Sequence, residues 1–251
     1  MLSGWVAGGL APSSVWVIDP KPSDWLQGLS AEGLHLNVGL PDAPAVAVMA
    51  VKPQMMSEAV PDAQSLGGGE TVILSIAAGT PIRFFEESFG AETPIIRAMP
   101  NTPAAVGRGI TALVGNAATR PEQVDMAEEL LSAIGQVVRV DDEGQMDAVT
   151  AVSGSGPAYV FHLIETLAKA GKAEGLPEGI AKRLALATVA GAGALAEQAE
   201  ESPSQLRVNV TSPAGTTAAA LEVLMDEGSG FPKLLGDAVA AAARRSRELG
   251  S

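Results

Sequence analysis

The amino-acid sequence predicts an α/β protein, with a Rossmann-like, mostly parallel sheet followed by an all-α domain. Short apolar runs alternate with helical stretches in the first half, which is typical of βαβ units. The apolar runs are nearly continuous, as expected of strands that are covered on both faces. Beyond about Asp142 these runs end, and long helical stretches rich in Ala and Leu take over. We therefore expect a Rossmann-like domain at residues 1–142 and a helical domain at residues 143–251.

The first expected element is a helix at residues 2–10, which we interpret as the buried end of a helix already under way at Met1. Gly8, Gly9 and Pro12 stop it before a strand at 15–18. The run lacks a basic segment before it and is too short to cross a bilayer, so we reject a signal sequence. Further strands are expected at 46–51, 71–76, 95–99, 110–114 and 136–140, and further helices at 159–173, 177–199, 217–227 and 231–249.

Three of the expected strands run into turns made of small or polar residues. These turns are Lys52-Pro53, the stretch 77–81 and the stretch 100–103. In open α/β sheets a ligand binds outside the carboxyl ends of the strands, so we expect the three turns to converge on one site. Small residues there would let a flat ring or a ribose approach the backbone. Each turn taken singly is explained equally well as a strand stop enforced by proline.

Residues 211–217 read Thr-Ser-Pro-Ala-Gly-Thr-Thr and lie directly before a helical pattern at 218–225. The first N–H groups of a helix have no intrahelical partner and bind carboxylates or phosphates. This turn therefore predicts a local anion-binding site. An ordinary capped loop is the alternative.

Composition excludes several classes of function. The net charge of −13 argues against nucleic acid and membrane surfaces as partners, and favours a small-molecule substrate held at a local site. Cysteine is absent, which excludes disulfides and thiolate chemistry and favours a cytoplasmic protein. His35 and His162 have no second histidine at metal-ligand spacing, so we expect neither a metal site nor histidine catalysis.

The stretch 182–197 is apolar on nearly every side and rich in Ala and Gly. A helix of this kind must be buried, and a domain of about 110 residues has little interior in which to bury it. A second subunit is the expected cover. This makes residues 143–251 an all-α dimerisation domain.

Three separated strings resemble pyrroline-5-carboxylate reductase: RAMPNTPAAVGRGITAL at 97–113, AVSGSGPAYVFHLIE at 151–165 and NVTSPAGTTAAALEVL at 209–224. VKP at 51–53 and SIAAG at 75–79 also match in position and order. The resemblance covers nearly the whole chain. It implies an oxidoreductase that reduces Δ1-pyrroline-5-carboxylate to L-proline with NADPH or NADH, the last step of proline biosynthesis. It also implies a homodimer with interlocked helical domains, in which the anion-binding turn of one subunit serves the cofactor domain of its mate, and a larger oligomer of dimers stays open.

The same resemblance assigns roles to individual residues. It places the substrate carboxylate on backbone N–H groups around Gly215, Thr216 and Thr217, helped by the hydroxyl of Ser212, and the ring nitrogen at Thr217, which would assist its protonation. Glu200 matches a position near the substrate, and Asn209 one near the nicotinamide; without the resemblance they would be a solvated acid and a loop asparagine. The residues implied to line the cofactor are Ala50, Val51, Lys52, Pro53, Ala77, Ala78, Met99, Pro100 and Asn101. The family's usual Gly-Gly is Ala214-Gly215 here, and the methyl group of Ala214 is tolerable only if φ stays negative.

Cofactor choice depends on Asp19, which follows the strand expected at 15–18 where the adenosine ribose would lie. A carboxylate there accepts hydrogen bonds from a free 2′-hydroxyl and repels a 2′-phosphate, which favours NADH. Lys21 would oppose it and admit NADPH. An Asp-Pro turn with no ligand role is the alternative.

The family's cofactor domain opens with a strand and a Gly-rich G-x-G-x-x-G/A loop, whereas this sequence starts inside the expected first helix. Glycine strings at 154–156 and 191–196 have no strand before them, so we assign them to a helix start and to helix packing. The sheet is therefore expected to lack its first strand, and cofactor binding to be weakened. This leaves open a catalytically impaired chain that only dimerises.

Another imine reductase or a reductase of the β-hydroxyacid dehydrogenase type is a further alternative. That type would call for a catalytic lysine on the helix between the domains. The corresponding stretch at 146–161 contains none.

Overall fold

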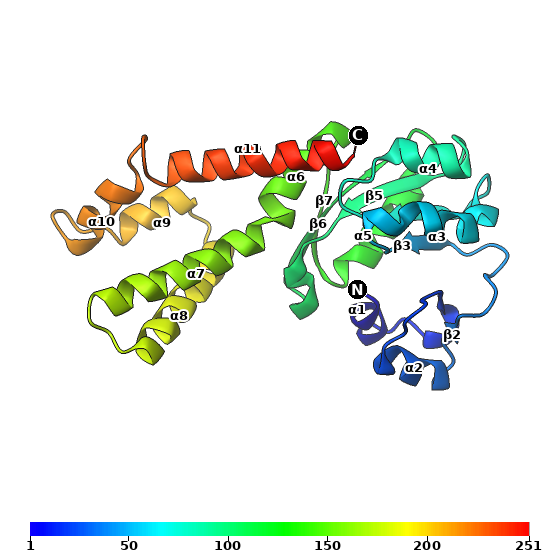
Figure 1. Cartoon of the computed structure of the whole chain (residues 1–251), viewed down its shortest axis with the longest axis horizontal. Helices are drawn as coiled ribbons and strands as arrows, with labels where there is room; N and C mark the ends of the chain where they lie inside the picture. The colour runs from blue at the N-terminus through cyan, green and yellow to red at the C-terminus, as the bar shows by residue number, and fades with distance from the viewer. Residues whose placement is uncertain (251) are drawn as a thin grey trace. The chain divides into compact units, whose positions relative to one another are not determined.

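The computed structural model describes residues 1–250, which form two compact units. The first unit comprises Met1–Gly154 together with the end of the chain from Ala243, and the second comprises Ser155–Ala242. Figure 1 shows both units and the labels used below. The compact units divide at Gly154, and the functional division predicted between residues 142 and 143 stays a prediction.

The first unit contains two sheets. A short parallel pair joins β1 (Trp16–Val17) to β2 (His35–Leu36). A five-stranded sheet has the order β3 (Val46–Met49), β4 (Val72–Ser75), β5 (Ile95–Met99), β6 (Gly109–Gly115) and β7 (Gly135–Arg139). All neighbours in it are parallel except β5 and β6. The predicted mostly parallel sheet is confirmed, whereas β2 was not predicted.

The helices of this unit are α1 (Leu2–Ala7), α2 (Asp24–Ala31), α3 (Met56–Ala63), α4 (Ile82–Phe89), α5 (Pro121–Ser132) and α6 (Met146–Val149). A π-helical segment, Thr150–Gly154, follows α6. The prediction that α1 is buried is wrong, because none of its residues is buried. Its Trp5 is anchored instead by a hydrogen bond from Nε1 to the Leu130 carbonyl, 2.7 Å away.

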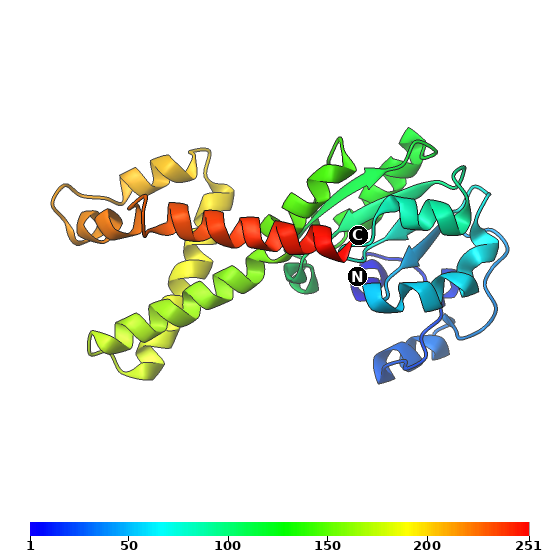
Figure 2. The same ribbon diagram turned by 45° about the horizontal axis from the view of Figure 1, so that its top comes forward.

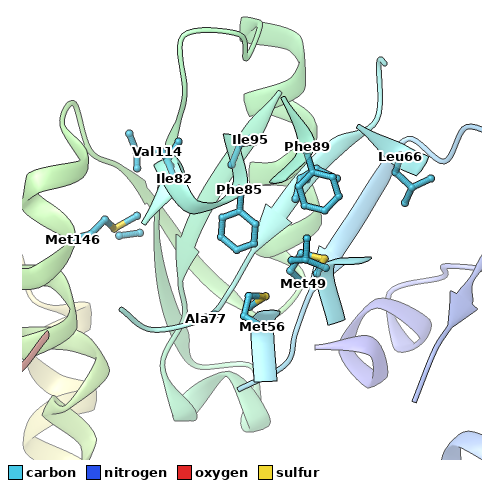
Figure 3. Packing of buried hydrophobic residues seen from close by; sticks show 13 residues of the cluster. Met49, Met56, Leu66, Ala77, Ile82, Phe85, Phe89, Ile95, Val114 and Met146 are labelled. Atoms are coloured by element: carbon cyan, nitrogen blue, oxygen red, sulfur yellow. The ribbon is translucent and has the colours of Figure 1, made fainter. Parts of the chain in front are cut away.

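Both faces of the five-stranded sheet are covered. Residues of α3, α4 and α6 pack on one face, where Phe85, Ile95 and Met146 are fully buried (Figure 3). Residues of α5 pack on the other face, against Leu74 and neighbouring strand residues. This two-sided covering explains why the strands are almost continuously apolar.

The second unit is entirely helical. It contains α7 (Gly156–Ala173), α8 (Glu178–Gln198), α9 (Pro203–Asn209), α10 (Thr216–Leu224) and the larger part of α11 (Phe231–Leu249). Figures 1 and 2 both show α7 and α8 lying side by side as a helical hairpin. The helix start predicted from the Gly154 string is confirmed. The stretch 191–196 is helical, as predicted, but the close helix packing predicted there is absent within residues 1–250 of the single chain, because an added Cβ at Gly191 or Gly193 would meet nothing within 4 Å.

Helix α8 is not buried within the single chain, in line with the expectation that its own domain has too little interior to cover it. Only Ala181 and Ala185 are buried, while Ile180, Leu184 and Leu186 are half or more exposed. Among residues 1–250, α8 is the one helix long and apolar enough to cross a membrane by length and composition. A large apolar surface on one helix calls for a cover outside the unit.

Candidate active site

The strands β3, β4 and β5 end at one edge of the sheet. Their register pairs Met49 with Ser75, and Ser75 with Arg97. Because all three run parallel, the segments that follow them leave the sheet at the same edge. The turns predicted at 52–53, 77–81 and 100–103 therefore leave the sheet at one edge, and the ligand site that they are expected to share stays a prediction.

The turn after β4 is built for close approach to its backbone. Ser75 Oγ accepts a hydrogen bond from the Ala77 N–H at 3.3 Å, and Ala77 is buried. Gly79 has φ of 76°, in the left-handed region that favours glycine. Ala77 and Gly79 are buried, whereas Ala78 between them is partly exposed, so Ala78 is the position of these three that a ligand could approach.

The end of the chain returns to this same turn. A Cβ built at Gly79 would lie 3.0 Å from Leu249 Cβ, and Arg83 Nη2 donates to the Gly250 carbonyl at 2.9 Å. Ser246 is 4% exposed and donates from Oγ to Asp147 Oδ1 at 2.5 Å. Residues 243–250 therefore buttress the turn from within the first unit.

The amide of Asn101 is fixed on both sides. Its Oδ1 accepts from the Ile110 N–H at 3.0 Å, and its Nδ2 donates to Ser153 Oγ at 3.3 Å. Met99 and Pro100 before it are partly buried. The segment after β5 is thus tied to the start of β6 and to the π-helical segment.

The segment after β3 is more open. Ala50 and Lys52 are exposed, whereas Val51 and Pro53 are partly buried. Pro53 opens a short 3₁₀ helix, Pro53–Met55, and Lys52 precedes it with extended backbone. Lys52 is therefore available to an anionic group at this edge.

Asp19 lies directly beyond β1, as predicted. Its Oδ1 accepts from the Lys21 N–H at 2.8 Å, which forms the Asp-Pro turn weighed above. Asn37 holds the Asp19 backbone by two hydrogen bonds of 2.9 Å, accepting from its N–H and donating to its carbonyl. Asn37 has φ of 53°, so its backbone is held in a conformation that favours Asn and Gly.

The predicted anion-binding turn opens α10 in the second unit. Gly215 is the N-cap residue, with extended backbone and no side-chain cap, and Thr216 is the first helical residue. The first-turn N–H groups are therefore not used by a capping side chain. Thr217 is partly buried, whereas Ser212 and Thr216 are exposed.

Ala214 contradicts the requirement of a negative φ, because its φ is 56°. The neighbouring Gly215 N–H donates to the Ser212 carbonyl at 3.0 Å, which closes the turn around Ala214. An L-residue in the left-handed region costs about 1–2 kcal/mol. The turn therefore keeps its shape at the expense of strain at one methyl group.

Glu200 and Asn209 flank helix α9. Glu200 is exposed in the connection between α8 and α9. Asn209 is the last residue of α9, and its Oδ1 accepts from Gln205 Nε2 at 2.8 Å. Their roles toward substrate and cofactor stay predictions.

Sequence reasoning missed the side chains that support these residues. Ser75 and Ser153 lay inside quoted strings but received no role, and Asn37 and Glu143 were not singled out. Asn37 follows the unpredicted strand β2, and Glu143 acts on residues far away in sequence. A polar residue at a strand end was the one available signal for Asn37.

The described residues contain one apolar hollow of interest and no metal-binding group. The hollow, of about 270 Å³, is lined by Ile110, Ala112, Val138, Ala148, Val149, Val152 and Ser153. Among residues 1–250, no group of three or more His, Cys, Asp or Glu could hold a metal ion.

A mostly parallel sheet with turns of small or polar residues at its carboxyl edge, followed by a helical region in which the start of α10 has no side-chain cap, has the architecture of a Rossmann-type, nicotinamide-dependent oxidoreductase. The family described as pyrroline-5-carboxylate reductase dimerisation matches residues 143–249. The pyrroline-5-carboxylate reductase of Synechocystis sp. is 48% identical over 207 residues, which cover 82% of this chain and 75% of that protein.

Two solved structures extend the match over the whole fold. A pyrroline-5-carboxylate reductase from Coxiella burnetii has a TM-score of 0.89 and 34% identity, covering 100% of this chain and 93% of that chain. The Plasmodium falciparum pyrroline carboxylate reductase with NADP bound has a TM-score of 0.83 and 28% identity, covering 99% of this chain and 92% of that chain. This chain belongs to the pyrroline-5-carboxylate reductase family.

Proposed function

We propose that this chain reduces Δ1-pyrroline-5-carboxylate to L-proline with NADPH or NADH, in the last step of proline biosynthesis. The observation that carries the proposal is the Coxiella burnetii reductase structure, which matches this fold over the full chain at 34% identity. The small-residue edge of the sheet is the feature of this chain that suits a nicotinamide ring. A cytoplasmic location, with neither nucleic acid nor membrane as partner, is part of the same proposal.

The cofactor would lie along the carboxyl edge of the sheet. Ala78 is the partly exposed small residue of the turn after β4 that a flat ring could approach, and Asn101 presents an amide already fixed by two hydrogen bonds. Lys52 is exposed and suits a phosphate. Asp19 and Lys21 would face the adenosine ribose, and Asn209 the nicotinamide. When bound, NADPH or NADH supplies the hydride.

The substrate carboxylate would bind where α10 begins. The backbone N–H groups of Thr216 and Thr217 and the positive end of the helix dipole favour an anion there, whereas the Gly215 N–H is already bonded to the Ser212 carbonyl. Ser212 adds a hydroxyl, and Glu200 would lie near the substrate. Thr217 would hydrogen-bond the imine nitrogen and help to keep it protonated, which makes the ring carbon a better hydride acceptor.

The assembly proposed is a homodimer through the helical unit. The matched family description names dimerisation for residues 143–249. Leu184, Leu186 and Leu195 of α8 are each more than half exposed in the single chain, so a second copy would cover apolar surface. The resemblance places the anion-binding turn of one copy beside the cofactor edge of the other.

The direct test is NADPH or NADH oxidation with pyrroline-5-carboxylate, with proline formation followed by chromatography. We expect proline to appear in step with cofactor oxidation, and Thr217→Ala to slow both. Oxidation without proline, or no reaction with either cofactor, would refute the proposed reaction. Sedimentation in the same preparation checks the dimer.

A second candidate function is a dimerising protein without reductase activity. The exposed apolar face of α8 favours it, because dimerisation through that face does not require a cofactor. A dimer that binds neither NADH nor NADPH in a calorimetric titration would favour this second function.

A further inference from the structure

We propose that Glu143 is a positioning residue for the cofactor edge of the sheet. The proposal concerns the turns after β4 and β5, whose contact with the cofactor rests on the proposed function. Glu143 lies outside both turns, in the short 3₁₀ helix Glu143–Gln145, and the resemblance assigns it no role. Its carboxylate nevertheless contacts both Arg97 in β5, the strand before one turn, and Ile82 in α4, the helix after the other turn.

One oxygen of Glu143 makes both contacts. Oε1 accepts from Arg97 Nη1 at 2.8 Å and from the Ile82 N–H at 2.7 Å. Arg97 belongs to β5, and Ile82 is the first residue of α4. The carboxylate therefore joins β5 to α4, which is the helix entered from the turn 77–81.

The start of α4 needs this carboxylate because the local sequence supplies no cap. The N-cap residue is Pro81, which has no side-chain acceptor, and the first turn of α4 contains no acidic residue. Helix starts carry unpaired N–H donors and a partial positive charge, so an acceptor with negative charge stabilises them. Glu143 provides that acceptor from another part of the chain.

Arg97 needs the same carboxylate for a different reason. It is 7% exposed within β5, and a buried guanidinium without a partner is strongly destabilising. Arg97 stands two positions before Met99, where the segment 99–101 begins. Its pairing therefore fixes the strand directly before the second cofactor turn.

The positions of the two cofactor turns therefore both depend on the Glu143 carboxylate. A displacement of the Glu143 carboxylate would move the exit of the turn 77–81 and the strand before residues 99–101 together. Small errors in the placement of a bound ring reduce catalysis steeply. The exposed pairing of Glu128 with Arg139 links α5 to β7 and reaches neither turn, so it serves as a matched comparison.

The test compares three substitutions at Glu143. Gln keeps the length and a carbonyl acceptor, Asp keeps the charge but is one methylene shorter, and Ala keeps neither. We expect the KM for NADPH or NADH to rise about tenfold in Glu143→Ala and Glu143→Asp, and less than about threefold in Glu143→Gln. The KM for the imine should stay near the wild-type value, because its proposed site is at α10.

Hydrogen exchange gives a readout that does not depend on activity. Amide exchange at residues 77–82 should accelerate about tenfold or more in the Ala and Asp variants and stay close to wild type in the Gln variant. Glu128→Gln is the control and should change neither exchange at 77–82 nor the KM for the cofactor. All variants are compared well below their melting temperatures, and Asp and Gln keep the test decisive if Ala fails to fold.

Two results would overturn the proposal. One is wild-type exchange at 77–82 together with wild-type cofactor KM in the Asp variant. The other is faster exchange at 77–82 without any rise in cofactor KM in the Ala and Asp variants, which would show that the contact stabilises the fold but does not position the cofactor turns. If the wild-type chain reduces no imine, the proposed function fails, while exchange at 77–82 and NADH affinity measured by fluorescence still decide the role of Glu143.

Discussion

Asn101 Nδ2 donates a hydrogen bond of 3.3 Å to Ser153 Oγ. The bond connects the segment after β5 to the π-helical segment that precedes α7. Single-turn π segments occur frequently at functional sites, because they displace the backbone locally. Here the displaced segment presents a hydroxyl to a residue proposed to line the cofactor.

Replacing Asn101 should therefore weaken cofactor binding. Asn101→Ala removes the acceptor of the Ile110 N–H and the donor to Ser153, and we expect kcat/KM for NAD(P)H to fall about tenfold. Ser153→Ala removes one long hydrogen bond and should lower it by less than about threefold. Steady-state kinetics with the cofactor varied at saturating imine measure both. Equal effects of the two substitutions would contradict this view.

Thr217→Ala should lower turnover more than cofactor affinity, because the proposed contact is with the reacting ring. We expect kcat to fall about 10²-fold or more, as for the loss of a proton-transfer group. Thr216→Ala is the matched control, since it keeps the backbone N–H of its neighbour in the same helix turn and its own side chain is exposed. Unchanged turnover in Thr217→Ala would end the assigned role.

Ala214→Gly should stabilise the protein. The φ of 56° at Ala214 is unfavourable for an L-residue, so glycine should raise the free energy of unfolding by about 1 kcal/mol. Ala219→Gly, inside α10, should lower it by about 0.5–1 kcal/mol and serves as the control. Urea denaturation measures both changes. A loss of stability in Ala214→Gly would show that the turn is not strained.

Asp19 should determine the balance between the two cofactors. Asp19→Ser removes the carboxylate that would repel a 2′-phosphate, and we expect the ratio of kcat/KM for NADPH over NADH to rise about tenfold. Asn37→Ala should weaken both cofactors equally, because Asn37 holds the backbone of Asp19 and not its carboxylate. Kinetics with each cofactor separate these outcomes. A ratio unchanged by Asp19→Ser would assign the turn no ligand role.

Glu178 makes a pH-dependent contribution to the α7–α8 hairpin. Its hydrogen bonds to Lys182 and Lys172, with the charge of both ammonium groups, lower its pKa from 4.5 to about 2. A depressed carboxyl pKa stabilises the folded state above the unfolded value of 4.5, and this contribution is lost as pH falls toward 2. The Tm difference between wild type and Glu178→Gln should shrink over that interval. Because the pair is exposed, the difference should also shrink in high salt, and a salt-independent difference would contradict the ion-pair origin.

The sequence predicted the sheet well where strands are covered on both faces, because continuous apolar runs at β3, β4 and β5 mark them clearly. It did not predict the direction of β6, since an apolar run carries no information about orientation. The two-residue β2 is too short to form a recognisable run. Helix α9 was missed because its Pro and Ser at the start are equally typical of a loop.

The features of the candidate site likewise include some that the sequence predicts and some that it does not. The shared edge of the three turns follows from parallel strands, so sequence was sufficient for it. Glu143 could not be found, because its partners Arg97 and Ile82 are 46 and 61 positions away. The condition that Ala214 keep a negative φ is not met, because the hydrogen bond between Gly215 and Ser212 closes the turn with a φ of 56° at Ala214.

The return of the C-terminal segment to Gly79 has a practical consequence for handling the protein. Leu249 and Gly250 lie against the turn after β4, so an affinity tag or fusion partner attached behind them would emerge next to that turn. Deletion of Leu249 and Gly250 would remove the packing atoms over Gly79 and the carbonyl that Arg83 binds. Reporter groups are therefore better attached at an exposed loop position such as Gly69, where an added Cβ would meet no atom of residues 1–250 within 4 Å.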